Sequence, residues 1–273
     1  MSTEEIKPDS NIKATIDAVT GLVTAIPIYQ DAIQPSAQQI GKSLETITKT
    51  VNIALAPIKA LVWGYEQVEQ FISSKVTEKL RGIPEENIIT PIPQIAGPAV
   101  EALRYTGHDV NLRELFANLL ANAMDKETAH SVHPSYVEII KNISSDEAIL
   151  LSAFITTKVY PIININSKYK DIKKGYRLIY PKYSHIDKII SLTRPDLIPV
   201  YVDNLCRLGV LESPKGIFMT SENIYEPLEN DSELDEIKKS IVESACEVSF
   251  DREIVRPTSF GSYFIDNVVI EKK

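Results

Sequence analysis

An apolar stripe with helical spacing runs through most of the N-terminal part of the chain and limits the fold more than any other feature. Apolar side chains recur every three or four positions from Ile12 to Ile26 and again from Ile40 to Leu80. This spacing keeps them on one face, so it predicts a long helix or helix pair that packs against another surface. Pro57 should kink the helix, because a proline removes a backbone donor and clashes with the preceding turn. Gly82-Ile83-Pro84 predicts its end.

The chain has 273 residues, enough for one or two domains. Residues 1–83 are predicted to form a long-helix arm, and residues 84–97 a proline-rich linker without apolar periodicity. Helical spacing returns over residues 98–158, which we expect to form a helical core domain with Pro98 in its first turn. Within it, Ser144-Ser145-Asp146-Glu147 is a capping-box pattern that opens a helix.

Residues 159–273 mix β-like and helical segments, and we expect a winged-helix-like region with a basic insertion here. The fold class predicted for the whole chain is therefore mainly α with minor β structure. The winged-helix likeness is an analogy of fold and identifies no site. The predicted segments are strands or an ordered loop over 159–169 and 175–183, a helix over 197–208 that ends at Gly209, a hairpin around Pro214–Gly216, a β-like stretch over 248–255 and a closing helix or strand over 257–270.

Composition and charge limit the partners and the cellular compartment that the sequence suggests. Apolar residues make up 44% of the chain and the net charge is −8, so nucleic acid or anionic lipid needs a local basic patch to bind. Cys206 and Cys246 lack metal or redox spacing and indicate buried thiols in a reducing compartment. The N-terminal residues lack a signal-peptide pattern, and no uncharged apolar run is long enough to span a bilayer. We expect a cytoplasmic protein, with peripheral attachment to the inner membrane face as the alternative.

A cluster of acids and histidines follows an apolar, helix-like run. Asp125, Glu127, His130 and His133 lie within nine residues and are the types that a metal site or acid–base reaction uses. However, His133 precedes Pro134, and a residue before proline is biased away from helix, so the helical spacing of the two histidines loses its meaning. We favour a polar junction between two helices over a catalytic or metal site.

A basic and tyrosine-rich insertion spans residues 167–188. Lysines bind phosphates and tyrosines stack on bases, so the insertion is a candidate contact for nucleic acid or another anion. No nucleic-acid-binding motif frames it, and a solvated insertion whose tyrosines cover the domain is the favoured interpretation. The candidate contact residues are Lys168, Lys170, Lys173, Lys174, Arg177 and Lys182.

The end of the N-terminal arm is nearly uncharged and aromatic. An amphipathic helix of this kind either packs on protein, in its own core or in a dimer, or lies on a membrane. We favour protein packing, because Glu66, Glu69 and Glu78 do not suit anionic lipid. The candidate membrane or partner contacts are Leu55, Ile58, Leu61, Val62, Trp63 and Tyr65.

Motifs for nucleotide binding, serine hydrolysis and zinc proteolysis are absent from the sequence, which contains only ten glycines and no glycine-rich loop. We therefore predict no catalytic residue, no cofactor and no metal site, and we identify no small-molecule substrate.

Long phrases of the sequence are similar to a known family. They are PIPQIAGPAVEALRYTGHDVNLRELFANLLANAMDKETAHSVHPSYVEIIKNISSDEAILL, the preceding ALAPIKALVWGYEQVEQFISSKVTEKLRGIPEENI, and the later VYVDNLCRLGVLE and PTSFGSYFIDNVV. Over roughly residues 50–270 the chain resembles the abortive-infection alpha (Abi-alpha) family. The resemblance implies a bacterial or phage-borne protein linked to abortive infection, in which an infected cell dies or stalls before phage spread. It carries over no catalytic residues.

The resulting hypothesis is a non-enzymatic phage-defence protein that acts through a protein partner or self-association. Three alternatives stay open: a membrane-active effector that uses residues 12–65, a nucleic-acid-binding regulator that uses the Lys/Tyr-rich insertion, and a metal-dependent enzyme built on the acid–histidine cluster.

Overall fold

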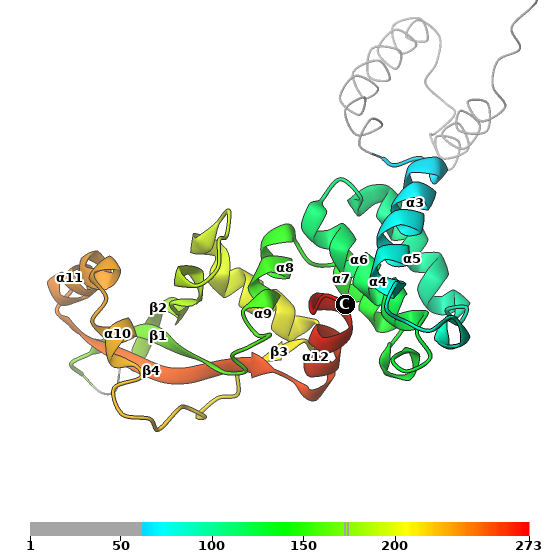
Figure 1. The fold of residues 1–273 in the computed structure, drawn as a ribbon. Coiled ribbons are helices and arrows are strands. Elements are labelled where there is room, and N and C mark those ends of the chain that lie inside the picture. Colours follow the sequence, from blue (N-terminus) through cyan, green and yellow to red (C-terminus); the bar gives the residue numbers. More distant parts are fainter. Residues whose placement is uncertain (1–61, 172, 174, 273) are drawn as a thin grey trace, which may run out of the picture. The chain divides into compact units, whose positions relative to one another are not determined.

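The computed structural model describes residues 62–171, 173 and 175–272. The apolar stripe before residue 62, with the predicted kink at Pro57, lies outside the described residues. The described chain is mainly helical and contains one four-stranded antiparallel sheet (Figure 1). The predicted fold class, mainly α with minor β, is confirmed at that level.

The described end of the N-terminal stripe forms one helical run. It consists of α3 (Tyr65–Phe71), a π-helical segment η1 (Ile72–Val76) and α4 (Thr77–Leu80). Val68, Val76 and Leu80 are buried, as expected for the inward face of an amphipathic helix. The helix ends at Leu80, directly before the predicted Gly82 stop.

The proline-rich segment is only partly extended. A short 3-10 turn, η2 (Glu85–Asn87), is followed by a segment that lies against the loop after α6, where Ile89 N donates to Met124 O at 2.8 Å. Helix α5 (Pro93–Thr106) then begins inside the predicted linker. The expectation that Pro98 opens this helix is wrong: Pro93 occupies the first turn, where a missing N–H costs nothing, and Pro98 lies within the helix.

Helix α6 (Val110–Ala123) lies at the centre of the helical body. All residues from Leu115 to Ala123 are buried, because α5, α7 (Ser135–Lys141), α8 (Ser145–Ser152) and the C-terminal π-helical segment η8 (Ile265–Val269) pack around it. The Asp109 side chain caps α6 by accepting from Asn111 N and Leu112 N. The predicted capping box that opens α8 is confirmed, with Ser144 and Glu147 bonded reciprocally.

The sheet is built from segments far apart in the sequence. Its strands are β1 (Tyr160–Tyr169), β2 (Tyr176–Tyr183), β3 (Leu211–Glu212) and β4 (Cys246–Pro257), in the order β2-β1-β4-β3. β1 and β4 pair along their length, from Tyr160 opposite Val255 to Tyr169 opposite Cys246. The predicted strands over 159–169, 175–183 and 248–255 are thus confirmed.

The remaining segments connect the sheet to the helical body. α9 (Ile198–Arg207) ends before Gly209, whose φ of +74° is the left-handed conformation expected of a helix stop. The predicted hairpin around Pro214–Gly216 is wrong: β3 has two residues and pairs with the end of β4, and residues 213–220 contain no strand. The winged-helix expectation is not confirmed. The other elements are η3 (Ala129–Ser131), η5 (Ile186–Lys188), η6 (Pro195–Leu197), α10 (Glu226–Glu229), η7 (Ser232–Leu234), α11 (Asp235–Glu243) and α12 (Ser259–Phe264).

Two apolar cores hold these elements together. The larger combines α6 residues such as Leu119 with Val202 of α9 and Phe264 of α12. The smaller lies on one face of the sheet, where Ile163 and Ile165 of β1 contact the α10–α11 segment. Among the described residues, no helix is both long enough and apolar enough to cross a bilayer.

Candidate functional site

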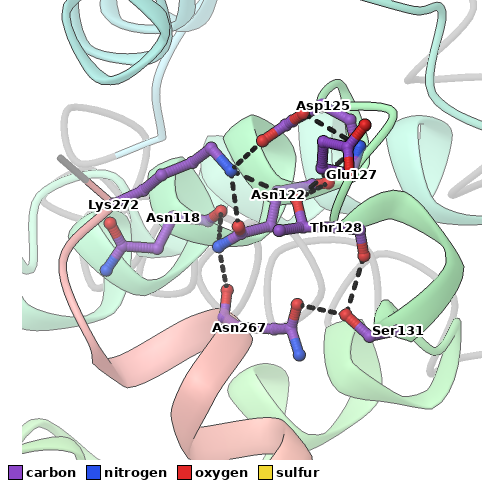
Figure 2. A network of polar contacts seen from close by, with 8 residues as sticks. All are labelled: Asn118, Asn122, Asp125, Glu127, Thr128, Ser131, Asn267 and Lys272. Carbon is purple, nitrogen blue, oxygen red and sulfur yellow. Dashed lines mark hydrogen bonds and ion pairs between the residues drawn. The ribbon is translucent and has the colours of Figure 1, made fainter. Parts of the chain in front are cut away.

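A network of polar residues, several of them buried, lies where the end of α6 meets the C-terminal segment. Figure 2 shows its members, which come from α6, the loop and 3-10 turn after it, and the last residues of the chain. They are Asn118, Asn122, Asp125, Glu127, Thr128, Ser131, Asn267 and Lys272. This region contains the acid–histidine motif singled out in the sequence, so its chemistry decides between a catalytic and a structural role.

Two asparagines of α6 hold the C-terminal helix. Asn118 and Asn122 are one turn apart and therefore point the same way from a helix that is otherwise apolar. Asn118 Nδ2 donates to Val268 O at 2.9 Å, and Asn122 Nδ2 donates to Asn267 O at 2.8 Å. These carbonyls lie at the end of η8, where the last turn of a helix leaves its acceptors unpaired. The asparagines thus cap η8 from a neighbouring helix.

An ion pair between Lys272 and Asp125 joins the same two segments. Lys272 Nζ lies 2.7 Å from Asp125 Oδ2, and the two side chains are 8% and 5% exposed. The ammonium also donates to Asn122 Oδ1 at 2.9 Å and to Thr128 Oγ1 at 3.1 Å, which occupies its three protons. Every donor of the buried cation is therefore satisfied inside the protein.

The electrostatics keep Asp125 ionised. Burial by itself would raise the pKa of Asp125, but the Lys272 ammonium and the Glu127 backbone N–H outweigh burial and hold the pKa below its usual range. A carboxylate that is ionised, paired and sealed from solvent is a poor general acid or base, which needs a pKa near the working pH and access to the reacting proton. The arrangement stabilises the docking of the C-terminal segment.

The other members of the predicted acid–histidine cluster point elsewhere. Glu127, His130 and His133 are exposed, whereas Asp125 is buried. The His133 ring lies 5.7 Å from the Phe260 ring, and its Nδ1 accepts from Ser135 N at the start of α7. Within residues 62–272 as described, no three His, Cys, Asp or Glu side chains are placed to hold a metal ion. The junction interpretation favoured from the sequence stays a prediction.

A buried lysine next to the network pairs with two more exposed carboxylates. Lys79 of α4 is 6% exposed, and its Nζ lies 3.3 Å from Glu114 Oε2 of α6 and 3.6 Å from Glu271 Oε1. The consecutive residues Glu271 and Lys272 thus pair with buried partners of opposite charge on α4 and at the end of α6. The C-terminal residues connect both helices to η8.

The basic insertion forms the β1–β2 hairpin. Lys168, Lys170, Lys173 and Arg177 are exposed, and the side chain of Lys174 lies outside the described residues. Lys168 lies directly opposite Glu247 in the β1–β4 register. Lys182 lies at the end of β2 and forms an ion pair with α9, where its Nζ lies 2.6 Å from Asp203 Oδ1. Four of the six predicted anion contacts are therefore exposed on this hairpin.

Few of the predicted membrane or partner contacts can be placed. Leu55, Ile58 and Leu61 lie outside the described residues, as does the side chain of Tyr65. Val62 is half-buried, and Trp63 packs edge-on against Phe71 with ring centroids 5.7 Å apart. Trp63 therefore contributes to packing between α3 and the helical body.

Sequence reasoning missed the asparagines, Asn267, Lys272 and Lys79. The asparagines had a local signal, since two polar residues one turn apart interrupt the apolar face of α6 and buried polar groups need partners. Lys272 and Lys79 had none, because their partners are distant in the sequence.

Comparison with known proteins gives one family and one solved structure. The family model described as abortive infection alpha matches residues 64–268. A search of curated proteins returned no match to the chain. A solved structure of an uncharacterized protein from the hydrocarbon-degrading marine bacterium Alcanivorax borkumensis SK2 is 18% identical, with 53% of this chain and 96% of that chain covered and a TM-score of 0.35.

Proposed function

The chain belongs to the abortive infection alpha family, and from that premise we propose that it is a phage-defence protein that acts by associating with protein chains rather than by chemistry on a substrate. The family model covers most of the described residues and includes the whole polar network except Lys272.

One observation carries the non-enzymatic part of the proposal. The acid–histidine motif does not converge on one point: Asp125 is buried and pairs with Lys272, Glu127 and His130 are exposed, and the exposed His133 contacts Phe260 and accepts from Ser135 N. Catalytic acid–base groups have to converge on one point that a substrate can reach. Because the acid–histidine motif forms no such point in the described residues, we place the action of the protein in what it binds.

Phage plating on cells that express the protein tests this proposal. We expect a reduced plating efficiency for at least one phage in a panel, and the same reduction for the triple variant Glu127→Ala, His130→Ala, His133→Ala. Light scattering on the purified protein and cross-linking in infected cells should reveal self-association or a defined partner complex. Loss of protection in a triple variant that is expressed and folded, or no protection by the wild type, would contradict the proposal.

The membrane and nucleic-acid alternatives have their own tests. Flotation of the full chain with liposomes of neutral or anionic lipid tests the effector that uses residues 12–65. Binding of nucleic acid by the hairpin lysines should weaken steeply with salt and be lost on charge reversal at Lys173 and Lys174.

A further inference from the structure

A cavity of about 360 Å³ lies where the end of β2 meets the turns η5, η6 and η7 and the start of α9. Its volume is within the range of roughly 300–1,000 Å³ that ligand sites occupy. It shares no residue with the polar network at the end of α6. Tyr180 and Tyr183 of β2 line the cavity, and their rings meet edge to face with centroids 5.9 Å apart. Aromatic rings in such a wall can cover an alkyl chain and attract a cation.

Three carboxylates from three separate turns line the same cavity. Asp187 comes from η5, Asp196 from η6 and Glu233 from η7. Burial makes the largest contribution to the raised pKa of the Tyr180 hydroxyl, and the negative charges of these three carboxylates raise it further. This effect is expected when all three lie near the hydroxyl. The fold therefore gathers negative charge beside Tyr180.

Two of the charges in the lining already have partners outside it. Lys182 is the one cation among the residues that line the cavity, and its Nζ lies 2.6 Å from Asp203 Oδ1 on α9. Asp196 accepts two hydrogen bonds from the Arg194 guanidinium, at 2.8 and 2.6 Å. Each of these pairs is neutral, so neither sets the net charge of the cavity.

The other two carboxylates of the lining have no cationic partner. Neither Asp187 nor Glu233 lies within ion-pair distance of a cation in the described part of the chain. Lys188 is close in sequence, but its Nζ pairs with Asp231 Oδ2 at 2.6 Å. The Glu233 carboxylate accepts from the hydroxyl of Tyr183, a neutral donor, at 3.3 Å. The charges that stay unpaired at this cavity are therefore both negative.

A buried hydroxyl in the cavity wall also lacks a partner. Ser184 follows β2, lines the cavity and is 6% exposed. Its Oγ makes no hydrogen bond to any described residue. Buried polar atoms in proteins are nearly always bonded, so this hydroxyl indicates an interaction that the described chain does not supply.

We infer that this cavity binds an alkylammonium group, carried either by a free polyamine or by a lysine side chain of another protein. An ammonium has three N–H donors, and the cavity offers it three acceptors: the carboxylates of Asp187 and Glu233 and the hydroxyl oxygen of Ser184. The tyrosine rings cover its alkyl chain and attract its charge. Two unpaired carboxylates disfavour an anionic ligand. In the described ranges no three His, Cys, Asp or Glu side chains are placed to hold a metal ion. The inference goes beyond the proposed function and does not depend on it.

Isothermal titration calorimetry on the full-length protein tests the inference, in about 150 mM salt to screen long-range attraction. The probes are spermidine, Nα-acetyl-lysine methylamide and the norleucine analogue of the second, which lacks the ammonium. We expect the norleucine probe not to bind. Binding of spermidine alone supports a free polyamine as the ligand, and binding of the lysine probe supports a lysine side chain. No binding of either ammonium probe, or equal binding of the norleucine probe, would overturn the inference.

Variants with wild-type circular dichroism locate the binding. The double variant Asp187→Asn, Glu233→Gln should bind at least about tenfold more weakly, and Ser184→Ala, which keeps both carboxylates, at least about threefold. The matched control is Glu86→Gln, Glu101→Gln, which removes the same charge from exposed positions of the helical body and should bind as the wild type does. Equal weakening in the two double variants would assign binding to the overall charge of −8 and overturn the inference, as would unchanged binding by Ser184→Ala.

Discussion

Replacing Lys272 with methionine should destabilise the protein more than almost any other change to a single residue near its C-terminus. The substitution keeps most of the side-chain volume and removes three contacts, at 2.7 Å to Asp125 Oδ2, 2.9 Å to Asn122 Oδ1 and 3.1 Å to Thr128 Oγ1. Asp125 is left buried without its cation. Removal of one partner from a buried ion pair costs about 3–5 kcal/mol, and at about 2–4 °C per kcal/mol the Tm should fall by about 6–20 °C.

Urea unfolding followed by circular dichroism measures the free energy of unfolding of the wild type, Lys272→Met, Asp125→Asn and the double variant. The double variant should recover much of the loss, because a neutral amide is far cheaper to bury than an unpaired carboxylate. The loss in Lys272→Met should also shrink from pH 7 toward pH 5. Without the ammonium, burial raises the pKa of Asp125, so the folded state takes up a proton as pH falls and the penalty disappears.

Three results would refute this reasoning. A Lys272→Met variant within about 1 kcal/mol of the wild type would mean that the ion pair contributes no more than an exposed one. A double variant as unstable as Lys272→Met would place the loss in packing rather than in the unpaired charge. A loss that does not change with pH would exclude titration of Asp125.

Three further substitutions test other parts of the fold. Asp146 accepts from two backbone N–H groups and the Tyr201 hydroxyl, so Asp146→Asn should cost about 2–3 kcal/mol at pH 7 in urea unfolding. Burial opposes ionisation, but these donors hold the pKa of Asp146 below its usual value; its contribution is present above about pH 4 and is lost as pH falls through the lowered pKa, so the two proteins should converge in acid. Gly261→Ala should lower stability by about 3 kcal/mol or more, because a Cβ there would overlap with the backbone carbonyl oxygen of Val210. Gly97→Ala in α5 has open space around its Cβ and should instead stabilise the protein by about 0.5–1 kcal/mol through helix propensity and so raise Tm. Equal Tm changes in the two alanine variants would contradict the packing at Gly261.

Short-range sequence patterns correctly predicted several helix ends and strands, because the residues that set them are neighbours in the chain. Ser144 and Glu147 form the expected box, Gly209 ends α9, and the alternating β-branched residues of β1 form a strand. The prediction failed at Pro98, because Pro93 already opens the helix, and at Pro214–Gly216, where β3 pairs with the distant end of β4 and residues 213–220 contain no strand.

The sequence by itself determined the family, the mainly helical character and the inward faces of the helices, because each depends on residues close together in the chain. Only the tertiary structure decided what the polar residues do. Asp125 became a buried anion because Lys272, 147 positions away, reached it. Asp187 and Glu233 line one cavity because the fold brings η5 and η7 to the end of β2. The energy of a buried charge or an unpaired hydroxyl depends on partners that the fold brings from far along the chain, so no local pattern could reveal it.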